Sequence, residues 1–290
     1  MSALHIDTIS LDAFNDVLSR YPSAVPDKLQ ELDTLRYDTI PSTVVERQDA
    51  AYLTKDEVEK LVEWKLKHGT FRPKLLSLVQ SNDSETIVQS TKKVSEFLAD
   101  VDLDGTTPSS SPLPALKILT QFKGIGPATA SLLLSVMKPD SIPFFSDELF
   151  RWCLWDDSGS PRGWKRGIKY NVKEYAELVE RVKGLRKRLN VRAVDIERVA
   201  WVLGREGVDV GNGENGHVKG EKAEQAKGTA DNGKEAETEQ AKSVEQAAKE
   251  KIEDSVEKPP KQTSKAGTKR KAREAKLPAE GTRKSSRTKN

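Results

Sequence analysis

The segment from Gln121 to Ala130 constrains the fold of this chain most, because it predicts two helices joined by a very tight turn. Gly124 and Gly126 lack Cβ, so the backbone can turn sharply and approach another surface closely. Pro127 suits the first turn of the second helix, where its missing N–H costs nothing. The start of that helix offers backbone N–H groups and the positive end of the helix dipole to an anion. The pattern therefore predicts a hairpin that binds the phosphates of a nucleic acid without reading its sequence.

A glycine-containing turn also occurs between helices that merely pack together, and the residues leave that interpretation open. Leu116 and Leu119 precede the turn, and Leu133 and Leu134 follow it, at the spacing of apolar helix faces. These flanks define a helix-hairpin-helix motif at residues 116–137 and favour nucleic-acid contact over simple packing. The candidate DNA-binding residues of the hairpin are Lys123, Gly124, Ile125, Gly126, Pro127, Ala128 and Thr129.

The chain changes character after about residue 205. Trp201 is its last aromatic residue, and the following stretch consists mainly of Glu, Lys, Ala, Gln, Gly, Ser and Thr. Such a segment buries too little apolar surface to offset its conformational entropy, so disorder is expected. The predicted organisation is a folded domain at 1–206, a disordered linker of mixed and mainly acidic charge at 207–257, and a disordered basic tail at 258–290.

Charge and cysteine content exclude several classes of protein. Residues 1–204 carry a net charge of −1, which argues against a large electrostatic footprint on DNA. The stretch 151–192 is locally basic, at +7, and is consistent with either a DNA-facing patch or a solvated helix face. Cys153 is the only cysteine and the three histidines lie far apart, so neither an intrachain disulfide nor a metal site is expected.

Two patterns bear on location. No apolar run is long enough to cross a membrane, so no membrane partner is expected. Lys269, Arg270, Lys271 and Arg273 form a basic cluster typical of nuclear import signals or of DNA-binding arms. The chain is therefore predicted to be a nuclear protein.

The first 206 residues predict helices and no strands. Apolar residues recur at helical spacing, and no alternating pattern occurs. Thr54 and Glu57 form a capping box that predicts the start of one helix, and Gly69 predicts its end. Eight or nine helices are expected, among them residues 10–20, 27–35, 54–69, 84–99, 171–189 and 194–204. The predicted fold class is all-α, in one compact multi-helix domain.

Residues 116–151 resemble the helix-hairpin-helix superfamily of DNA glycosylases, which includes the endonuclease III and AlkA-like base-excision enzymes. In that superfamily a helix, a short loop and a catalytic Asp at the start of the next helix follow the hairpin. Here the loop is Lys138–Pro143, and Phe145–Glu148 is the region of the Asp. The segments Leu53–Glu57, Trp64–Lys65, Phe71–Pro73, Phe144–Glu148 and Val202–Gly204 are similar to the Amun-like branch of the superfamily, whose activity is unassigned.

The resemblance implies a monomeric domain that acts on double-stranded DNA in base-excision repair. An ungapped alignment from Gly126 places the catalytic position on Ser146, and a one-residue loop difference restores Asp147. Asp147 is therefore the implied catalytic residue, with Glu148 and Ser146 as lesser candidates. Ala128 stands where bifunctional members carry Lys, which implies a monofunctional enzyme without a Schiff base. The resemblance also implies that hairpin carbonyl groups hold a monovalent cation when DNA is bound, and no other cofactor is expected.

The chemistry requires a carboxylate and an aromatic pocket. Cleavage of an N-glycosidic bond develops positive charge on the sugar, which a nearby carboxylate stabilises. The base must leave the stack and enter a pocket, for which Phe144, Phe145, Trp152 and Trp155 are candidates, with Tyr170 as a further one. Each ring has an alternative place in the protein core, and a carboxylate at a helix start has the alternative role of a cap.

The basic candidates for DNA contact outside the hairpin are Arg151, Lys165 and Arg166. Arg151 is equally suited to pair with the carboxylate of Asp147 or Glu148. Three functions remain open: a DNA glycosylase, a catalytically silent DNA- or chromatin-binding domain of the same fold, and a protein-interaction module whose hairpin only packs helices. No protein partner can be named from the sequence.

Overall fold

The computed structural model describes residues 2–47, 51–105, 107, 110–158 and 160–211. Their regular structure is helical throughout, with no strand among them, which confirms the predicted all-α class. These residues all belong to one compact unit, Met1–Lys219. The basic cluster at 269–273 and most of the segments predicted to be disordered lie outside the described residues.

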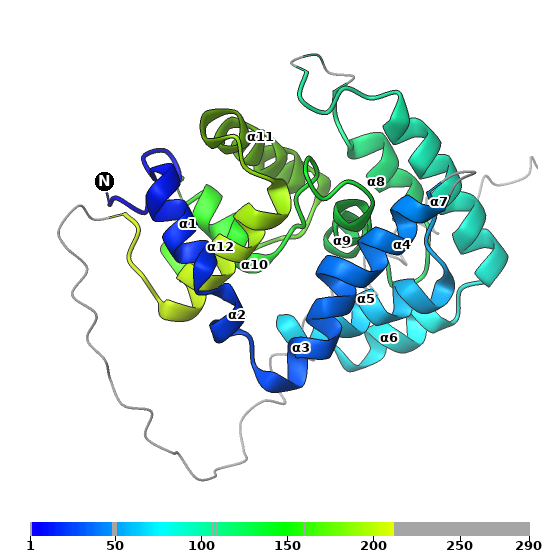
Figure 1. The fold of residues 1–290 in the computed structure, drawn as a ribbon. Helices are drawn as coiled ribbons and strands as arrows, with labels where there is room; N and C mark the ends of the chain where they lie inside the picture. Colours follow the sequence, from blue (N-terminus) through cyan, green and yellow to red (C-terminus); the bar gives the residue numbers. More distant parts are fainter. Residues whose placement is uncertain (1, 48–50, 106, 108–109, 159, 212–290) are drawn as a thin grey trace, which may run out of the picture. The chain divides into compact units, whose positions relative to one another are not determined.

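Twelve α-helices occur in this part of the chain, more than the eight or nine expected (Figure 1). The first six are α1 (Leu11–Ser19), α2 (Tyr21–Ala24), α3 (Asp27–Thr34), α4 (Ile40–Glu46), α5 (Lys55–His68) and α6 (Pro73–Gln80). The remaining six are α7 (Ser84–Ala99), α8 (Leu113–Leu119), α9 (Pro127–Met137), α10 (Asp147–Cys153), α11 (Val172–Leu189) and α12 (Ala193–Glu206).

Helix α9 lies between two groups of helices (Figure 1). One group contains α1, α2, α10, α11 and α12, and the other contains α3 to α8. Helix α9 contacts α4, α5 and α8 on one side and α11 on the other. Every residue from Ala128 to Met137 is buried, so α9 is a core helix whose sequence is apolar or small on all faces.

Local sequence signals set several helix ends as predicted. The hydroxyl of Thr54 accepts from the backbone N–H of Glu57, and the carboxylate of Glu57 accepts from the backbone N–H of Thr54, which confirms the capping box. The same helix ends at Gly69, as expected. Ser10, Asp83 and Asn171 cap α1, α7 and α11 in the same way, with side-chain oxygens that accept from backbone N–H groups.

The helix predicted at residues 27–35 is longer than expected, because it continues through a π-helical turn, Leu35–Thr39, into α4. Pro41 lies just after this turn. Its ring has no N–H to donate to the carbonyl of Tyr37, and it crowds that carbonyl, so a wider turn is favoured there. The π-helical turn carries Arg36, whose guanidinium is directed into the protein core.

A buried ion pair joins this turn to the rest of the core. Arg36 Nη2 lies 3.2 Å from Glu197 Oε2, and both side chains are almost completely buried. The same Nη2 donates to Ser135 Oγ on α9 at 2.6 Å, and the hydroxyl of Tyr37 donates to Glu197 Oε1 at 3.0 Å. Burial raises the pKa of Glu197, and the Arg36 charge opposes that rise. The network therefore connects α9 and α12 to the helices that precede α5.

The packed chain extends beyond the predicted domain end at residue 206. Gly207 adopts the left-handed conformation that ends α12. The carbonyl of Val208 accepts a hydrogen bond from Trp164 Nε1 at 2.8 Å, and Val210 is fully buried. The domain boundary therefore lies no earlier than residue 211, because Val210 adds an apolar side chain to the core.

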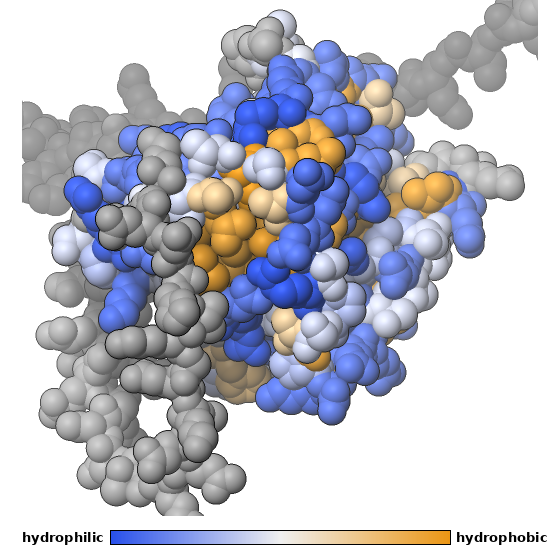
Figure 2. Space-filling view, turned by 60° about the vertical axis from the view of Figure 1, so that its left-hand side comes forward, coloured by the Kyte–Doolittle hydropathy of each residue, from blue (hydrophilic) through white to orange (hydrophobic). Residues whose placement is uncertain are grey.

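Hydrophilic residues surround an exposed apolar area on the face that Figure 2 shows. Five large apolar side chains are strongly exposed in the described part of the chain: Leu11, Val45, Phe71, Leu78 and Val172. Phe71 lies in the loop between α5 and α6, and Leu78 lies on α6. Among the described residues no helix has both the length and the apolar character needed to cross a membrane.

Removal of one partner of the buried ion pair is expected to destabilise the domain strongly. An Arg36→Ala variant leaves the Glu197 carboxylate buried without its cation, and we expect a loss of about 3–5 kcal/mol in the free energy of unfolding. Urea unfolding followed by tryptophan fluorescence measures this change. Arg192→Ala is the control, because the Arg192–Asp140 pair is exposed and should contribute little. Equal unfolding midpoints for the two variants would contradict the assigned role of Arg36.

Candidate active-site cleft

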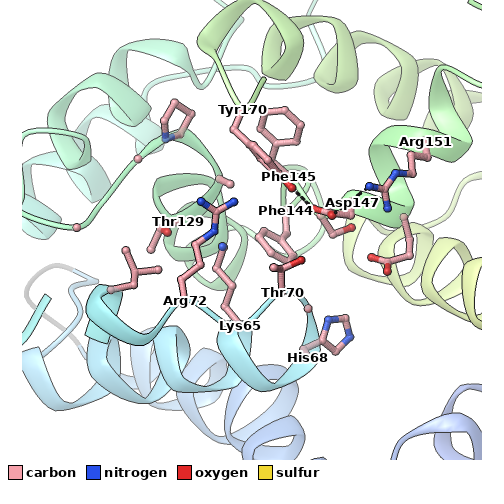
Figure 3. Close-up of a pocket in the computed structure, with 18 of the residues that line it drawn as sticks. Lys65, His68, Thr70, Arg72, Thr129, Phe144, Phe145, Asp147, Arg151 and Tyr170 are labelled. Carbon is pink, nitrogen blue, oxygen red and sulfur yellow. Dashed lines mark hydrogen bonds and ion pairs between the residues drawn. The ribbon is translucent and has the colours of Figure 1, made fainter. Parts of the chain in front are cut away.

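A cleft of about 450 Å³ opens where the hairpin, the end of α5 and the start of α10 meet (Figure 3). The loop between α5 and α6 forms one wall, and the hairpin and the segment before α10 form the other. The cleft brings together the hairpin and the carboxylate that were predicted from separate parts of the motif. Its lining includes Lys65, His68, Thr70, Arg72, Gly124, Gly126, Pro127, Ala128, Thr129, Phe144, Phe145, Ser146, Asp147, Glu148, Arg151, Tyr170 and Arg205.

The first half of the hairpin is fixed against α6. Gly124 has φ +76°, and a Cβ there would lie 3.0 Å from Leu78 Cβ and 3.2 Å from the carbonyl oxygen of Leu75. Asn82 binds the backbone of Lys123 on both sides: its Oδ1 accepts from the N–H and its Nδ2 donates to the carbonyl, each at 2.9 Å. Gly124 is therefore required for both its conformation and its close approach to α6.

The second half of the hairpin is open toward the cleft. Gly126 is the N-terminal cap of α9, and a Cβ added to it would meet nothing within 4 Å. No side chain caps this helix, so the amide groups of its first turn keep their hydrogen-bonding capacity. Ala128 and Thr129 lie in that turn and line the cleft. The side chain of Lys123 is exposed and that of Ile125 is buried, so the backbone is the part of the hairpin suited to bind an anion.

Ser146 and Asp147 have different roles at the start of α10. The hydroxyl of Ser146 accepts from the N–H of Leu149 and caps the helix. Asp147 is the first residue of the helix, and 26% of its side chain is exposed at the cleft. Its carboxylate accepts from the hydroxyl of Tyr170 at 2.7 Å and lies 3.4 Å from Arg151 Nη2 (Figure 3). The carboxylate that faces the cleft is therefore that of Asp147, and the capping role belongs to Ser146.

Tyr170 occupies an unusual backbone conformation, with φ +54°. Non-glycine residues rarely adopt this region, and such residues gather at functional sites. Here the conformation places the phenol oxygen against the carboxylate of Asp147. Burial and the bond to Asp147 raise the pKa of the Tyr170 hydroxyl, so it stays protonated and donates to the carboxylate at neutral pH.

Only two of the four predicted pocket aromatics line the cleft. Phe144 and Phe145 do so, although both are largely buried. Trp152 is fully buried and donates its Nε1–H to the carbonyl of Leu4, so its prediction as a pocket residue is wrong. Trp155 packs edge-on against Trp164 at 5.1 Å and does not line the cleft.

The basic side chains in the cleft also differ from those expected. Arg151 lines it and pairs with Asp147, while its Nε donates to the carbonyl of Arg166 at 3.0 Å. Lys165 and Arg166 do not line it, and the guanidinium of Arg166 donates to loop carbonyls, including that of Ser158. Instead the cleft contains Lys65, Arg72 and Arg205. Lys65 and Arg72 flank the loop between α5 and α6, and Arg205 comes from α12, far along the chain.

His68 lies at the base of the cleft between two tryptophan rings. Its ring stacks on Trp64 at 4.3 Å and on Trp201 at 4.9 Å. Its Nε2 is buried without a hydrogen-bond partner in the described part of the chain. Burial lowers the pKa of His68 to about 3, with further lowering from the charges of Arg36 and Arg205. The imidazole is therefore neutral at physiological pH.

Burial also changes the proton affinity of two other cleft residues. The pKa of Glu148 is raised by burial and by the charge of Asp147. The pKa of Lys65 is lowered by burial and by the like charge of Arg72, with a smaller opposing effect from Asp147. The cleft thus combines a carboxylate held by hydrogen bonds, a second carboxyl group that favours its proton, and an amine that releases its proton more readily than usual.

No metal centre is evident in the part of the chain that the structure describes, since no three His, Cys, Asp or Glu side chains are grouped to hold an ion. The monovalent cation expected at the hairpin would use backbone oxygens. The carbonyl of Phe122 already accepts from the N–H of Ile125, and that of Lys123 accepts from Asn82. One lone pair of each oxygen remains, and the cation stays a prediction.

Comparison with known proteins gives no relative: no protein-family model, no curated protein and no solved structure matches this chain. The resemblance to DNA glycosylases therefore stays a prediction from the sequence. A functional proposal for this chain therefore rests on the geometry of the cleft.

The neutral state of His68 predicts a pH effect on stability. Its folded pKa of about 3 lies below the ordinary value of about 6.5, so between these values the unfolded chain binds one more proton. The contribution of neutral His68 to the free energy of unfolding is therefore complete above pH 6.5. It falls as the pH decreases from there, by about 1.4 kcal/mol per pH unit. Urea unfolding of the wild type and of His68→Phe is measured at pH 7, 6, 5 and 4. Below pH 6.5 the free energy of unfolding of the wild type should fall relative to that of the variant by about 1.4 kcal/mol per pH unit. Parallel pH curves would contradict the burial of a neutral imidazole.

Proposed function

We propose that this protein is a DNA N-glycosylase of the helix-hairpin-helix kind, which hydrolyses the bond between a base and its sugar. One observation carries the proposal: the uncapped start of α9 and the carboxylate of Asp147 face the same cleft. The first is suited to a backbone phosphate, and the second to the positive charge that develops on a sugar. The two are 20 residues apart in the motif, and both are needed for this reaction.

The size and lining of the cleft support the proposal. Its volume of about 450 Å³ falls in the range of small-molecule sites, about 300–1,000 Å³. Tyr170 offers aromatic surface against which an extruded base can pack, and Phe144 and Phe145 also line the cleft, although they are only 4% and 1% exposed. Phe71, 68% exposed between two cleft residues, is available to stack on the bases that remain in the duplex.

In the proposed reaction, different groups of the cleft bind the phosphates and stabilise the sugar. Amide groups of α9 and the cations Arg72 and Arg205 hold the phosphates beside the extruded nucleotide. The carboxylate of Asp147 stabilises the sugar as the bond breaks, and orients the water that attacks it. The hydroxyl of Tyr170 donates to that carboxylate and holds it in place.

Gly126 allows a direct test of phosphate binding at the hairpin. Gly126→Ala should fold normally, since the added methyl group meets no atom within 4 Å, but that group stands where a phosphate must approach. Fluorescence anisotropy measures the affinity for a duplex with a tetrahydrofuran abasic site and the affinity for an intact duplex. We expect Gly126→Ala to lower the ratio of the first affinity to the second. The ratio cancels non-specific binding by the basic C-terminal residues.

Gly167→Ala is the matched control, because Gly167 also has open space around it but does not line the cleft. Gly124→Ala is unsuitable, because its positive φ alone costs about 1–2 kcal/mol of stability. An unchanged affinity ratio in Gly126→Ala would show that the hairpin is a packing turn, and would favour a protein-interaction module.

Base release tests the catalytic part of the proposal. The full chain is incubated with duplexes that carry alkylated, deaminated or oxidised bases, and the freed base is measured by chromatography. Asp147→Asn should reduce release from the preferred duplex by at least about 100-fold, because it removes the charge that stabilises the transition state. Asp140→Asn is the control, since Asp140 pairs with Arg192 away from the cleft.

A DNA-binding domain without catalysis is the second candidate function. The ion pair between Asp147 and Arg151 favours it, because a carboxylate held by a cation stabilises a charged sugar less well. Intact binding of the abasic-site duplex, with no base released from any duplex, would support this candidate. Location in the nucleus stays a prediction, because the basic cluster at 269–273 lies outside the described residues.

A further inference from the structure

Lys65 differs from the other lysines of α5. Its side chain projects into the cleft beside Arg72 (Figure 3), and it has no hydrogen bond or ion pair within the described chain. Each of the other lysines on this helix has an acidic neighbour: Lys55 lies 4.0 Å from Glu59, and Lys60 and Lys67 lie 3.2 and 2.8 Å from Glu63. Lys65 is therefore the amine of α5 that remains free to meet a ligand in the cleft.

The surroundings of Lys65 favour a reactive amine over a permanent cation. The side chain is half-buried, and it projects into the cleft beside the guanidinium of Arg72. Burial and the like charge of Arg72 lower the pKa of Lys65, and the carboxylate of Asp147 only partly opposes them. A lysine that only had to bind phosphate would gain nothing from such a position, since a lower pKa weakens its charge. A nucleophilic lysine needs these conditions.

We propose that Lys65 is the nucleophile by which the cleft reacts with the aldehyde of an abasic site in DNA, forming a covalent imine. The inference rests on the proposed function, because DNA must enter the cleft with the sugar near Asp147. It goes beyond that function, because the substrate is the product of base excision rather than the damaged base. The hairpin position at which bifunctional glycosylases carry their lysine holds Ala128, so the proposed amine comes from a different helix, α5.

The step balances without any oxidant or reductant. The lone pair of Lys65 Nζ attacks C1′ of the ring-opened sugar, and a C–N bond forms as the carbonyl π electrons move to oxygen. The oxygen takes one proton from the nitrogen and one from solvent water, and it leaves as water when the C–O bond breaks. A protonated imine remains, whose positive charge lies in the same cleft as the carboxylate of Asp147. Hydrolysis by one water returns the free amine and the aldehyde.

Reductive trapping tests this assignment. The full chain is mixed with a duplex that carries one natural abasic site, and sodium borohydride converts any imine to a stable amine. The covalent complex is quantified on a denaturing gel, and mass spectrometry identifies the modified lysine. We expect the adduct on Lys65 in the wild type, and its loss in both Lys65→Arg and Lys65→Gln. Lys67→Arg is the matched control on the same helix, and should keep the full yield, since Lys67 pairs with Glu63 outside the cleft.

Binding measurements distinguish failure of the imine proposal from failure of the proposed function. A duplex with tetrahydrofuran, which has no aldehyde, reports binding alone. Normal binding of that duplex with no adduct on Lys65, or with adducts only on other lysines, would overturn the assignment and leave the proposed function standing. Weak binding by Lys65→Gln that Lys65→Arg restores, without an adduct in the wild type, would show a phosphate contact only. Absence of any binding would overturn both proposals. Trapping needs no base release, so a catalytically silent glycosylase still gives a clear result.

Discussion

The burial of α9 on all sides is the constraint on which the cleft depends. Its residues from Ala128 to Met137 are all buried, and only its N-terminal turn lines the cleft. Pro127 has no N–H and no side chain caps the helix, so the amides of Ala128 and Thr129 are the unused donors at the positive end of the dipole. The position of the candidate anion site therefore follows from the packing of the core.

The same helix fixes the second wall of the cleft. Ser131 on α9 accepts a hydrogen bond from the N–H of Phe145 at 2.9 Å, so the segment that leads to Asp147 is attached to α9 one turn beyond the hairpin. The hydroxyl of Tyr175 donates to the carbonyl of Pro143 and holds the same segment from α11. The distance between the amide groups and the carboxylate is thus set by buried hydrogen bonds, not by a flexible loop.

Local signals in the sequence predicted the fold class, the tight turn between α8 and α9, the capping box at Thr54, and a helix start at Ser146 or Asp147, because each depends on residues close together in the chain. The π-helical turn was missed, although Pro41 marks it. Trp152 was proposed for the pocket because it lies close to Asp147 in the sequence, but the direction of its side chain depends on which helices cover α10. Lys65 and His68 could not be predicted, since their place in the cleft depends on how α5 packs against α9.

Affinity for a charged abasic-site analogue tests the central claim most directly, because that claim concerns the charge a sugar meets in the cleft. A duplex with a cationic pyrrolidine abasic site and one with neutral tetrahydrofuran differ mainly in that charge. We predict tighter binding of the pyrrolidine duplex by the wild-type chain, and loss of this preference in Asp147→Asn. Equal affinity for both duplexes, or a preference that survives in Asp147→Asn, would contradict the account.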